Sequence, residues 1–130
     1  MISKKLDISN TPNIPKIIHQ IWIQGKDKMP KHLREYHNEC RRINNDFVHV
    51  FWDEPAILKL LGEKFGQAHV NLYHSLPIYA QKSDIGRYAI LYEYGGIYLD
   101  VDMLCRKNMA PFLDYDFFCT KDVLFFIYPR

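Results

Sequence analysis

The chain has 130 residues, of which 48% are hydrophobic and 25% charged, and its formal net charge is +2 at pH 7. This composition is typical of a soluble globular protein, and the length fits one domain with its own core. The small net charge and scattered basic residues give no reason to expect a nucleic-acid partner.

The polar N-terminus lacks the apolar run of a signal peptide or transmembrane anchor, so we expect no transmembrane segment and a cytoplasmic location. Cys40, Cys105 and Cys119 are widely spaced and form no C-x-x-C pair. A zinc ribbon or a thioredoxin-type site is therefore not expected, and the cysteines are predicted to be reduced thiols in a core.

Residues 1–13 are predicted to form a flexible N-terminal arm, and residues 14–130 are expected to form the single domain. Apolar patterns then predict a strand over 16–23, a helix over 31–44, a strand over 47–52 and a helix over 55–65. Residues 67–77 give no clear pattern.

The longest predicted helix covers residues 78–94, and it is apolar on nearly every face, which is typical of a buried helix. Gly95 suits a left-handed helix end, and Gly96 allows close backbone approach. A strand is expected over 97–104, followed by a short helical turn over 109–115 and strand-like segments over 117–120 and 124–128.

This alternation of strands and helices predicts an α/β fold with a mostly parallel sheet flanked by helices. Ligands in such sheets bind beyond the carboxyl ends of the strands. Trp22, Asp100 and Asp102 follow or end predicted strands, so we expect them at one edge of the sheet.

Asp100 and Asp102 stand two residues apart, and in an extended chain such side chains point to the same side. Two close carboxylates repel, which either raises the pKa of one of them or calls for a hard cation such as Mg²⁺ or Mn²⁺. The alternative is a surface turn whose carboxylates are simply solvated.

Asp84 and Arg87 lie one helical turn apart and can pair with each other. The pair is either structural or suited to a ligand, since the Arg fork fits phosphate or sugar hydroxyls. Trp22 is either a core residue or a stacking surface for a nucleobase. His19 is expected to be a hydrogen-bonded core histidine. The chain contains no P-loop, no G-x-G-x-x-G loop and no G-x-S-x-G elbow.

Two segments carry a family resemblance: IPKIIHQIWIQG at 14–25 and SDIGRYAILYEYGGIYLDVDM at 83–103. They resemble the DXD-containing sugar-binding region of the glycosyltransferase 32 family. That family includes Och1-like mannosyltransferases and capsular polysaccharide transferases, and it is related to clostridial toxin glucosyltransferases. The resemblance implies a GT-A-like (Rossmann-like) nucleotide-sugar-binding domain that transfers a hexose from a UDP- or GDP-sugar to a glycan or other acceptor, with retention.

The resemblance also implies roles for individual residues. Asp102 would bind Mn²⁺ (or Mg²⁺) directly, and Asp100 would contact the metal through water, the donor ribose or both. Asp84 and Arg87 would hold the donor sugar, Ser83 and Tyr98 would line the donor pocket, and Trp22 would stack on the base. Asp102 and Arg87 are the expected catalytic residues.

Two departures from the family pattern stand out. Gly86 occupies a position where a bulky apolar residue is usual, so a hole in the helix is expected. The chain ends 28 residues after Asp102, so the acceptor-side portion is expected to be short or missing, and the apolar C-terminal edge could support self-association. An inactive nucleotide-sugar-binding remnant and a purely structural α/β protein are the competing hypotheses.

Overall fold

The computed structural model describes residues 13–120. In this part of the chain, three parallel strands form one sheet in the order β2-β1-β3: β1 (Ile17–Ile21), β2 (Val48–Trp52) and β3 (Ile97–Tyr98). The helices are α1 (Lys31–Ile43), α2 (Glu54–Leu60), α3 (Gln67–Ser75) and α4 (Tyr79–Tyr94), with short helical segments η1 (Lys26–Lys28), η2 (Leu61–Phe65) and η3 (Ala110–Phe112). The predicted α/β fold with a parallel sheet flanked by helices is confirmed.

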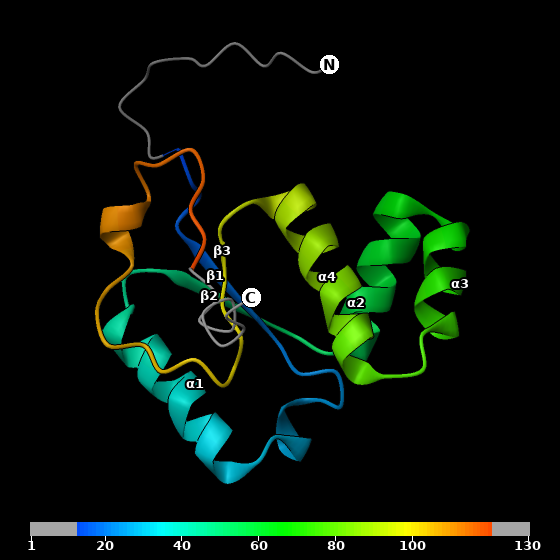
Figure 1. Ribbon diagram of the computed structural model, residues 1–130, viewed down its shortest axis with the longest axis horizontal. Helices are drawn as coiled ribbons and strands as arrows, with labels where there is room; N and C mark the ends of the chain where they lie inside the picture. Colours follow the sequence, from blue (N-terminus) through cyan, green and yellow to red (C-terminus); the bar gives the residue numbers. More distant parts are fainter. Residues whose placement is uncertain (1–12, 121–130) are drawn as a thin grey trace, which may run out of the picture.

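The sheet lies between two helical layers (Figure 1), with α1 on one side and α2, α3 and α4 on the other. The core is divided accordingly. One apolar cluster joins Ile21 and Trp52 to Ile57, Tyr73 and Ile90 from α2, α3 and α4. The other cluster packs the remaining face of the sheet against α1 and the segment that follows β3, with members Ile14, Ile18, Cys40, Phe47, Ile97, Leu99, Cys105 and Leu113. The strands are therefore covered on both faces, as parallel sheets require.

The helix α2 begins where its sequence provides a cap. The Asp53 carboxylate accepts a hydrogen bond from the Ala56 amide at 3.0 Å, and Pro55 stands in the first turn, where its missing N–H costs nothing. The Glu54 amide donates to the Ile23 carbonyl at 3.1 Å. The start of α2 is thus fixed beside the carboxyl end of β1.

The turn between α4 and β3 depends on two glycines. Gly95 (φ +63°) and Gly96 (φ +85°) adopt backbone conformations that other residues rarely take. At Gly96, a Cβ atom would lie 2.7 Å from the Ile17 carbonyl oxygen. The close approach expected at Gly96 is confirmed, whereas Gly95 has the expected positive φ but a ψ of −149°, which lies outside the left-handed helical region. The turn brings the chain directly alongside β1.

The helix α4 is buried on one face, so the prediction of an all-round buried helix is wrong. Tyr88 and Tyr92 are 74% and 77% exposed, so the face of α4 that carries them lies in water. The hole expected at Gly86 is also absent. A Cβ there would lie 3.0 Å from Ile57 Cδ1 and 3.2 Å from Ile21 Cδ1, so these two side chains fill the space.

The predicted strand over 97–104 is too long, since β3 ends at Tyr98 and residues 101–102 form a turn. Its partner β1 continues for two residues beyond His19, the last residue paired with β3, so the end of β1 is not the reason. The chain instead leaves the sheet at the turn that the hydrogen bond from the Met103 amide to the Asp100 carbonyl closes. Residues 117–120 form no strand either, although the helical turn expected over 109–115 is confirmed by η3. Of the arm predicted over 1–13, residues 1–12 lie outside the described residues, as do the strand and self-association edge predicted over 124–128.

The buried polar groups of the sheet are mostly paired. His19 is buried and hydrogen-bonded, as expected. The buried His37 ring Nδ1 lies 2.7 Å from Gln20 Oε1. Cys40 and Cys105 are buried free thiols, whereas Cys119 is exposed, which corrects the expectation for that residue.

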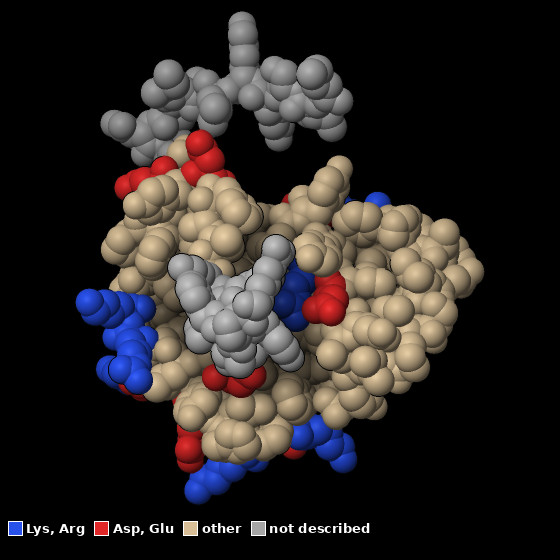
Figure 2. Space-filling model, viewed as in Figure 1, with Lys and Arg blue, Asp and Glu red and all other residues tan. Residues whose placement is uncertain are grey.

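The surface shows no large field of one sign on the face drawn in Figure 2, where Lys and Arg side chains lie in small separate groups. None of the helices within residues 13–120 has the length and apolar character needed to cross a membrane.

Replacing Gly96 with Ala should lower the free energy of unfolding by more than about 2 kcal/mol, because the methyl group meets a backbone carbonyl at a positive φ. Gly62→Ala in η2 is the matched control, since its Cβ would meet only Val70 Cγ2 at 3.7 Å. Urea unfolding of both variants checks this. Equal stability of the two variants would contradict the close approach at Gly96.

Acid should destabilise the fold through His37. Burial, followed by the nearby charges of Lys26, Arg41 and His49, lowers the pKa of His37 to about 4. The unfolded chain takes up this proton near pH 6.5, so stability falls as pH drops from about 6.5 to 4, by at most about 1.4 kcal/mol per pH unit. Urea unfolding across this range should show a shallower slope for His37→Leu. The exposed His32→Leu should keep the original slope, and an unchanged slope in His37→Leu would refute the assignment.

Candidate functional site

A cavity of about 530 Å³ lies at the carboxyl ends of β1 and β3 and beside the first turns of α4. Six of the seven residues predicted for the site line this cavity: Trp22, Ser83, Arg87, Tyr98, Asp100 and Asp102. The seventh, Asp84, is 57% exposed and pairs with Arg87. The structure therefore gathers residues that the sequence places up to 80 positions apart.

Arg87 connects the two halves of the predicted site. Its Nη2 atom lies 2.9 Å from Asp84 Oδ1 on the same helix and 3.5 Å from Asp100 Oδ1 on the loop after β3. Its Cζ atom stands 4.7 Å from the centre of the Tyr98 ring. The Arg87 side chain is 29% exposed, and its Nε has no hydrogen-bond partner among the described residues. That Nε atom is buried, so a ligand in the cavity would meet the terminal nitrogens of this partly exposed side chain.

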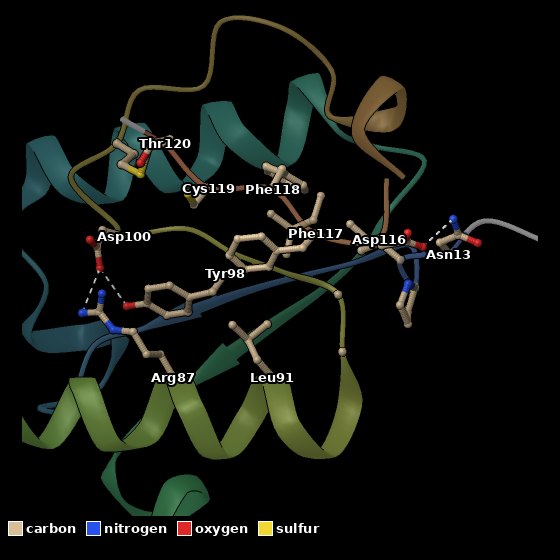
Figure 3. Close-up of a pocket in the computed structure, with 16 residues that line it drawn as sticks. Asn13, Arg87, Leu91, Tyr98, Asp100, Asp116, Phe117, Phe118, Cys119 and Thr120 are labelled. Atoms are coloured by element: carbon tan, nitrogen blue, oxygen red, sulfur yellow. Dashed lines mark hydrogen bonds and ion pairs between the residues drawn. The ribbon is translucent and has the colours of Figure 1, made fainter. Parts of the chain in front are cut away.

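Tyr98 holds the Asp100 carboxylate from the other side. Its hydroxyl donates a hydrogen bond to Asp100 Oδ1 at 2.8 Å, and Figure 3 shows Tyr98 and Arg87 converging on this carboxylate. Burial, and then the neighbouring Asp100 charge, raises the pKa of Tyr98. The phenol therefore stays protonated and serves as a fixed donor that orients Asp100.

Asp100 and Asp102 reach the cavity through a turn and not along a strand, which corrects the prediction. The Met103 amide donates to the Asp100 carbonyl at 3.1 Å and closes the turn. Aspartate is favoured at the first position of such a turn. Both residues still line the same cavity, and Asp102 is exposed. The shared location of the two carboxylates is confirmed, although its local geometry is different.

Trp22 forms part of the wall at the end of β1. Its amide donates to the Trp52 carbonyl at 2.9 Å, and its own carbonyl accepts from the Gly25 amide at 3.0 Å. The indole Nε1 is buried and lacks a hydrogen-bond partner among the described residues. A buried indole N–H usually has a partner. Trp22 therefore lines the cavity with a partly exposed indole, whose buried N–H group is unpaired in the described part of the chain.

The donor set at the cavity is compatible with a hard divalent cation. Asp100 and Asp102 supply carboxylate oxygens, which Mg²⁺ and Mn²⁺ prefer, and Mg²⁺ usually takes few protein ligands beside water and substrate phosphates. Within residues 13–120 no group of three or more His, Cys, Asp or Glu side chains is arranged to hold a metal. A cation here would thus need ligands from a bound phosphate and water.

A second cavity, of about 520 Å³, adjoins the first, and Arg87, Tyr98 and Asp100 line both. Leu91 of α4 forms part of one wall, and Phe117 and Phe118 lie on the segment opposite (Figure 3). The three polar residues thus stand where the two cavities meet.

Tyr79 is a lining residue that the sequence predictions missed. A signal for it exists, because Tyr79, Ser83 and Arg87 follow one another at intervals of four residues on α4. Side chains with this spacing share one helix face. Ile23, Gln24, Leu33 and Val101 also line the cavity, and no sequence pattern distinguishes them.

A parallel α/β sheet with a D-x-D sequence at its carboxyl edge agrees with a GT-A-like glycosyltransferase domain. The model of the family described as "Glycosyltransferase sugar-binding region containing DXD motif" matches residues 30–123, and the chain belongs to this family.

Several known proteins are similar to this chain. An uncharacterised glycosyltransferase of Acanthamoeba polyphaga mimivirus is 52% identical over 107 residues, which cover 82% of this chain and 43% of that protein. Inositol phosphoceramide mannosyltransferase 1 of Schizosaccharomyces pombe is 38% identical over 77% of this chain and 31% of its own length. A mannosyl phosphorylinositol ceramide synthase of Saccharomyces cerevisiae is 28% identical over 83% of this chain and 28% of its own length. The chain thus spans less than half of each of these relatives. No solved structure matches it.

Removing the Arg87 side chain should leave the fold intact. Its two carboxylate partners are half exposed, so Arg87→Ala should lower the free energy of unfolding by only about 1 kcal/mol. Thermal and urea unfolding check this, with the exposed Arg106→Ala as the control. Outright unfolding of Arg87→Ala would favour a purely structural ion pair.

Proposed function

We propose that this chain binds a nucleoside diphosphate sugar in the first cavity and, as part of a glycosyltransferase, transfers its hexose to a glycan or another hydroxyl acceptor. The observation that supports the proposal most strongly is the convergence of Arg87, Asp100 and Asp102 on a cavity that Trp22 also lines. Family membership supports the same reaction class. Relatives named as mannosyltransferases favour mannose as the transferred hexose.

The chemistry of the cavity suits the parts of such a donor. Trp22 offers a flat face to the nucleobase, because aromatic rings stack on bases of any sequence. Arg87 offers planar donors to a phosphate or a sugar hydroxyl, and the Asp84 carboxylate can accept from hydroxyls. Ser83 adds a hydroxyl on the same wall. Trp22, Ser83, Asp84, Arg87, Tyr98 and Asp100 are the proposed donor-binding residues.

The proposed cofactor is Mn²⁺, or Mg²⁺ in its place, held by Asp102 and Asp100. A bound divalent cation would neutralise the diphosphate and stabilise the negative charge that develops on the leaving group. Tyr98 keeps the Asp100 carboxylate in position through its hydrogen bond. Arg87 adds positive charge beside the same carboxylate, so Asp102 and Arg87 are the proposed catalytic residues.

The proposed reaction retains the configuration of the anomeric carbon. The bond between the sugar and the diphosphate breaks, and the acceptor oxygen forms a new bond on the same face. The leaving phosphate takes the acceptor proton, so no carboxylate base is required. The single Arg87 guanidinium can stabilise the charge on that phosphate.

An inactive nucleotide-sugar-binding protein is the second candidate, because the residues that line the first cavity suit donor binding alone as well as transfer. Donor binding would be the same in both cases, whereas only the transferase would hydrolyse the donor or pass the sugar to an acceptor. The cytoplasmic location stays a prediction.

Asp102→Asn should abolish the metal dependence of donor binding. We expect isothermal titration of the unchanged chain with GDP-mannose, UDP-glucose or UDP-galactose to show binding in Mn²⁺ and at least about tenfold weaker binding without it. In Asp102→Asn the affinity should match the metal-free value.

The matched control is Asp114→Asn, an exposed carboxylate that lines neither cavity. It should bind the donor as the unchanged chain does. Failure of every sugar nucleotide to bind in Mn²⁺ would rule out both the transferase and the binding protein.

A further inference from the structure

His19 is a buried residue of β1 that lines neither cavity described above, yet its side chain makes two hydrogen bonds. Trp52 Nε1 on β2 donates to His19 Nδ1 at 3.1 Å. On the opposite side of the ring, His19 Nε2 lies 3.0 Å from the Gly95 carbonyl oxygen. The imidazole thus connects β2, β1 and the turn between α4 and β3.

These partners determine which ring nitrogen carries the proton. An indole N–H can only donate, so His19 Nδ1 must be the unprotonated acceptor. The proton of the neutral ring is therefore on Nε2, which donates to the Gly95 carbonyl. Burial lowers the pKa of His19, although the Gly95 contact acts in the opposite sense, and the ring accordingly stays neutral.

The main chain of His19 also contacts the residues that follow the turn between α4 and β3. The Leu99 amide donates to the His19 carbonyl at 3.0 Å, and His19 pairs with Tyr98 in the sheet. His19 therefore anchors both Gly95 and Leu99. Because β3 has only two residues, few other backbone hydrogen bonds hold this segment against β1.

The segment that His19 anchors, from Gly95 to Leu99, determines where Tyr98 and Asp100 lie relative to Arg87. Tyr98 and Asp100 follow the Gly95–Gly96 turn, whereas Arg87 lies earlier, on α4, whose last turn is closed by a hydrogen bond from the Gly95 amide to the Leu91 carbonyl at 2.9 Å. The distance between Arg87 and Asp100 thus depends on how this turn is held.

We propose that His19 is a positioning residue of the donor site: the Nε2–H tautomer, which both Trp52 and the Gly95 carbonyl require, fixes the Gly95–Gly96 turn and so brings Tyr98 and Asp100 to Arg87. The consequence for donor binding rests on the proposed function. The tautomer and the placement of Tyr98 do not depend on it.

Nuclear magnetic resonance tests the structural part on the full chain. Ring nitrogen shifts of ¹⁵N-labelled histidine should show the Nε2–H form for His19, both in the unchanged chain and in Trp52→Phe, where the Gly95 carbonyl still requires a donor. His19→Phe should shift the Tyr98 ring signals, because Arg87 lies over that ring. A dominant Nδ1–H form, or unchanged Tyr98 signals in a folded His19→Phe, would overturn the inference.

Rescue by a conservative variant separates positioning from simple packing. His19→Gln retains an amide donor for the Gly95 carbonyl, whereas His19→Phe retains only ring volume. We expect donor affinity in Mn²⁺, measured with the sugar nucleotide that binds the unchanged chain, to fall about tenfold in His19→Phe and about threefold or less in His19→Gln. Equal losses in both variants would overturn the inference.

The two proposals can fail separately. If no sugar nucleotide binds the unchanged chain, the proposed function fails, and the ring nitrogen and Tyr98 signals still decide the role of His19. If His19→Phe does not fold, the shift of Tyr98 signals is measured instead in His19→Leu, which likewise has no donor for the Gly95 carbonyl. Unchanged Tyr98 signals there would contradict the role.

Discussion

The pairing of β3 with β1 is the contact on which the candidate site depends. Only two residues of β3 pair with β1, yet they set the positions of Tyr98 and of the carboxylates that follow. The close approach at Gly96, where a Cβ would lie 2.7 Å from the Ile17 carbonyl oxygen, makes this pairing possible. Because Trp22 directly follows β1, one short parallel ladder joins both ends of the cavity.

Charge balance explains why four ionised side chains can share this region. Arg87 lies between Asp84 and Asp100 and offsets part of their charge, while Asp102 is exposed to water. The net charge of these four residues is therefore negative, with one guanidinium against three carboxylates. A cation and its phosphate ligand can bind at such a site without leaving a buried charge uncompensated. A cluster that was already neutral would not favour the binding of a cation.

The parts of this account that follow from local geometry could be predicted from the sequence. The Asp84–Arg87 pair follows from helical spacing, and the turn at Gly95 and Gly96 follows from backbone freedom. The length of β3 could not be predicted, because apolar residues continue after Tyr98 although the chain leaves the sheet at the turn after Asp100. The approach of Arg87 to Asp100 also depends on tertiary packing, as does the role of His19.

Paramagnetic broadening by Mn²⁺ tests the central claim most directly, which is that these residues form one metal-dependent donor site. In the presence of a sugar nucleotide, Mn²⁺ should broaden the amide signals of residues 100–102 first, and the Trp22 indole N–H signal should shift on nucleotide binding. Both effects should require the nucleotide and the metal together at low metal concentration. Broadening centred away from residues 100–102, or a Trp22 signal that does not respond, would contradict the account.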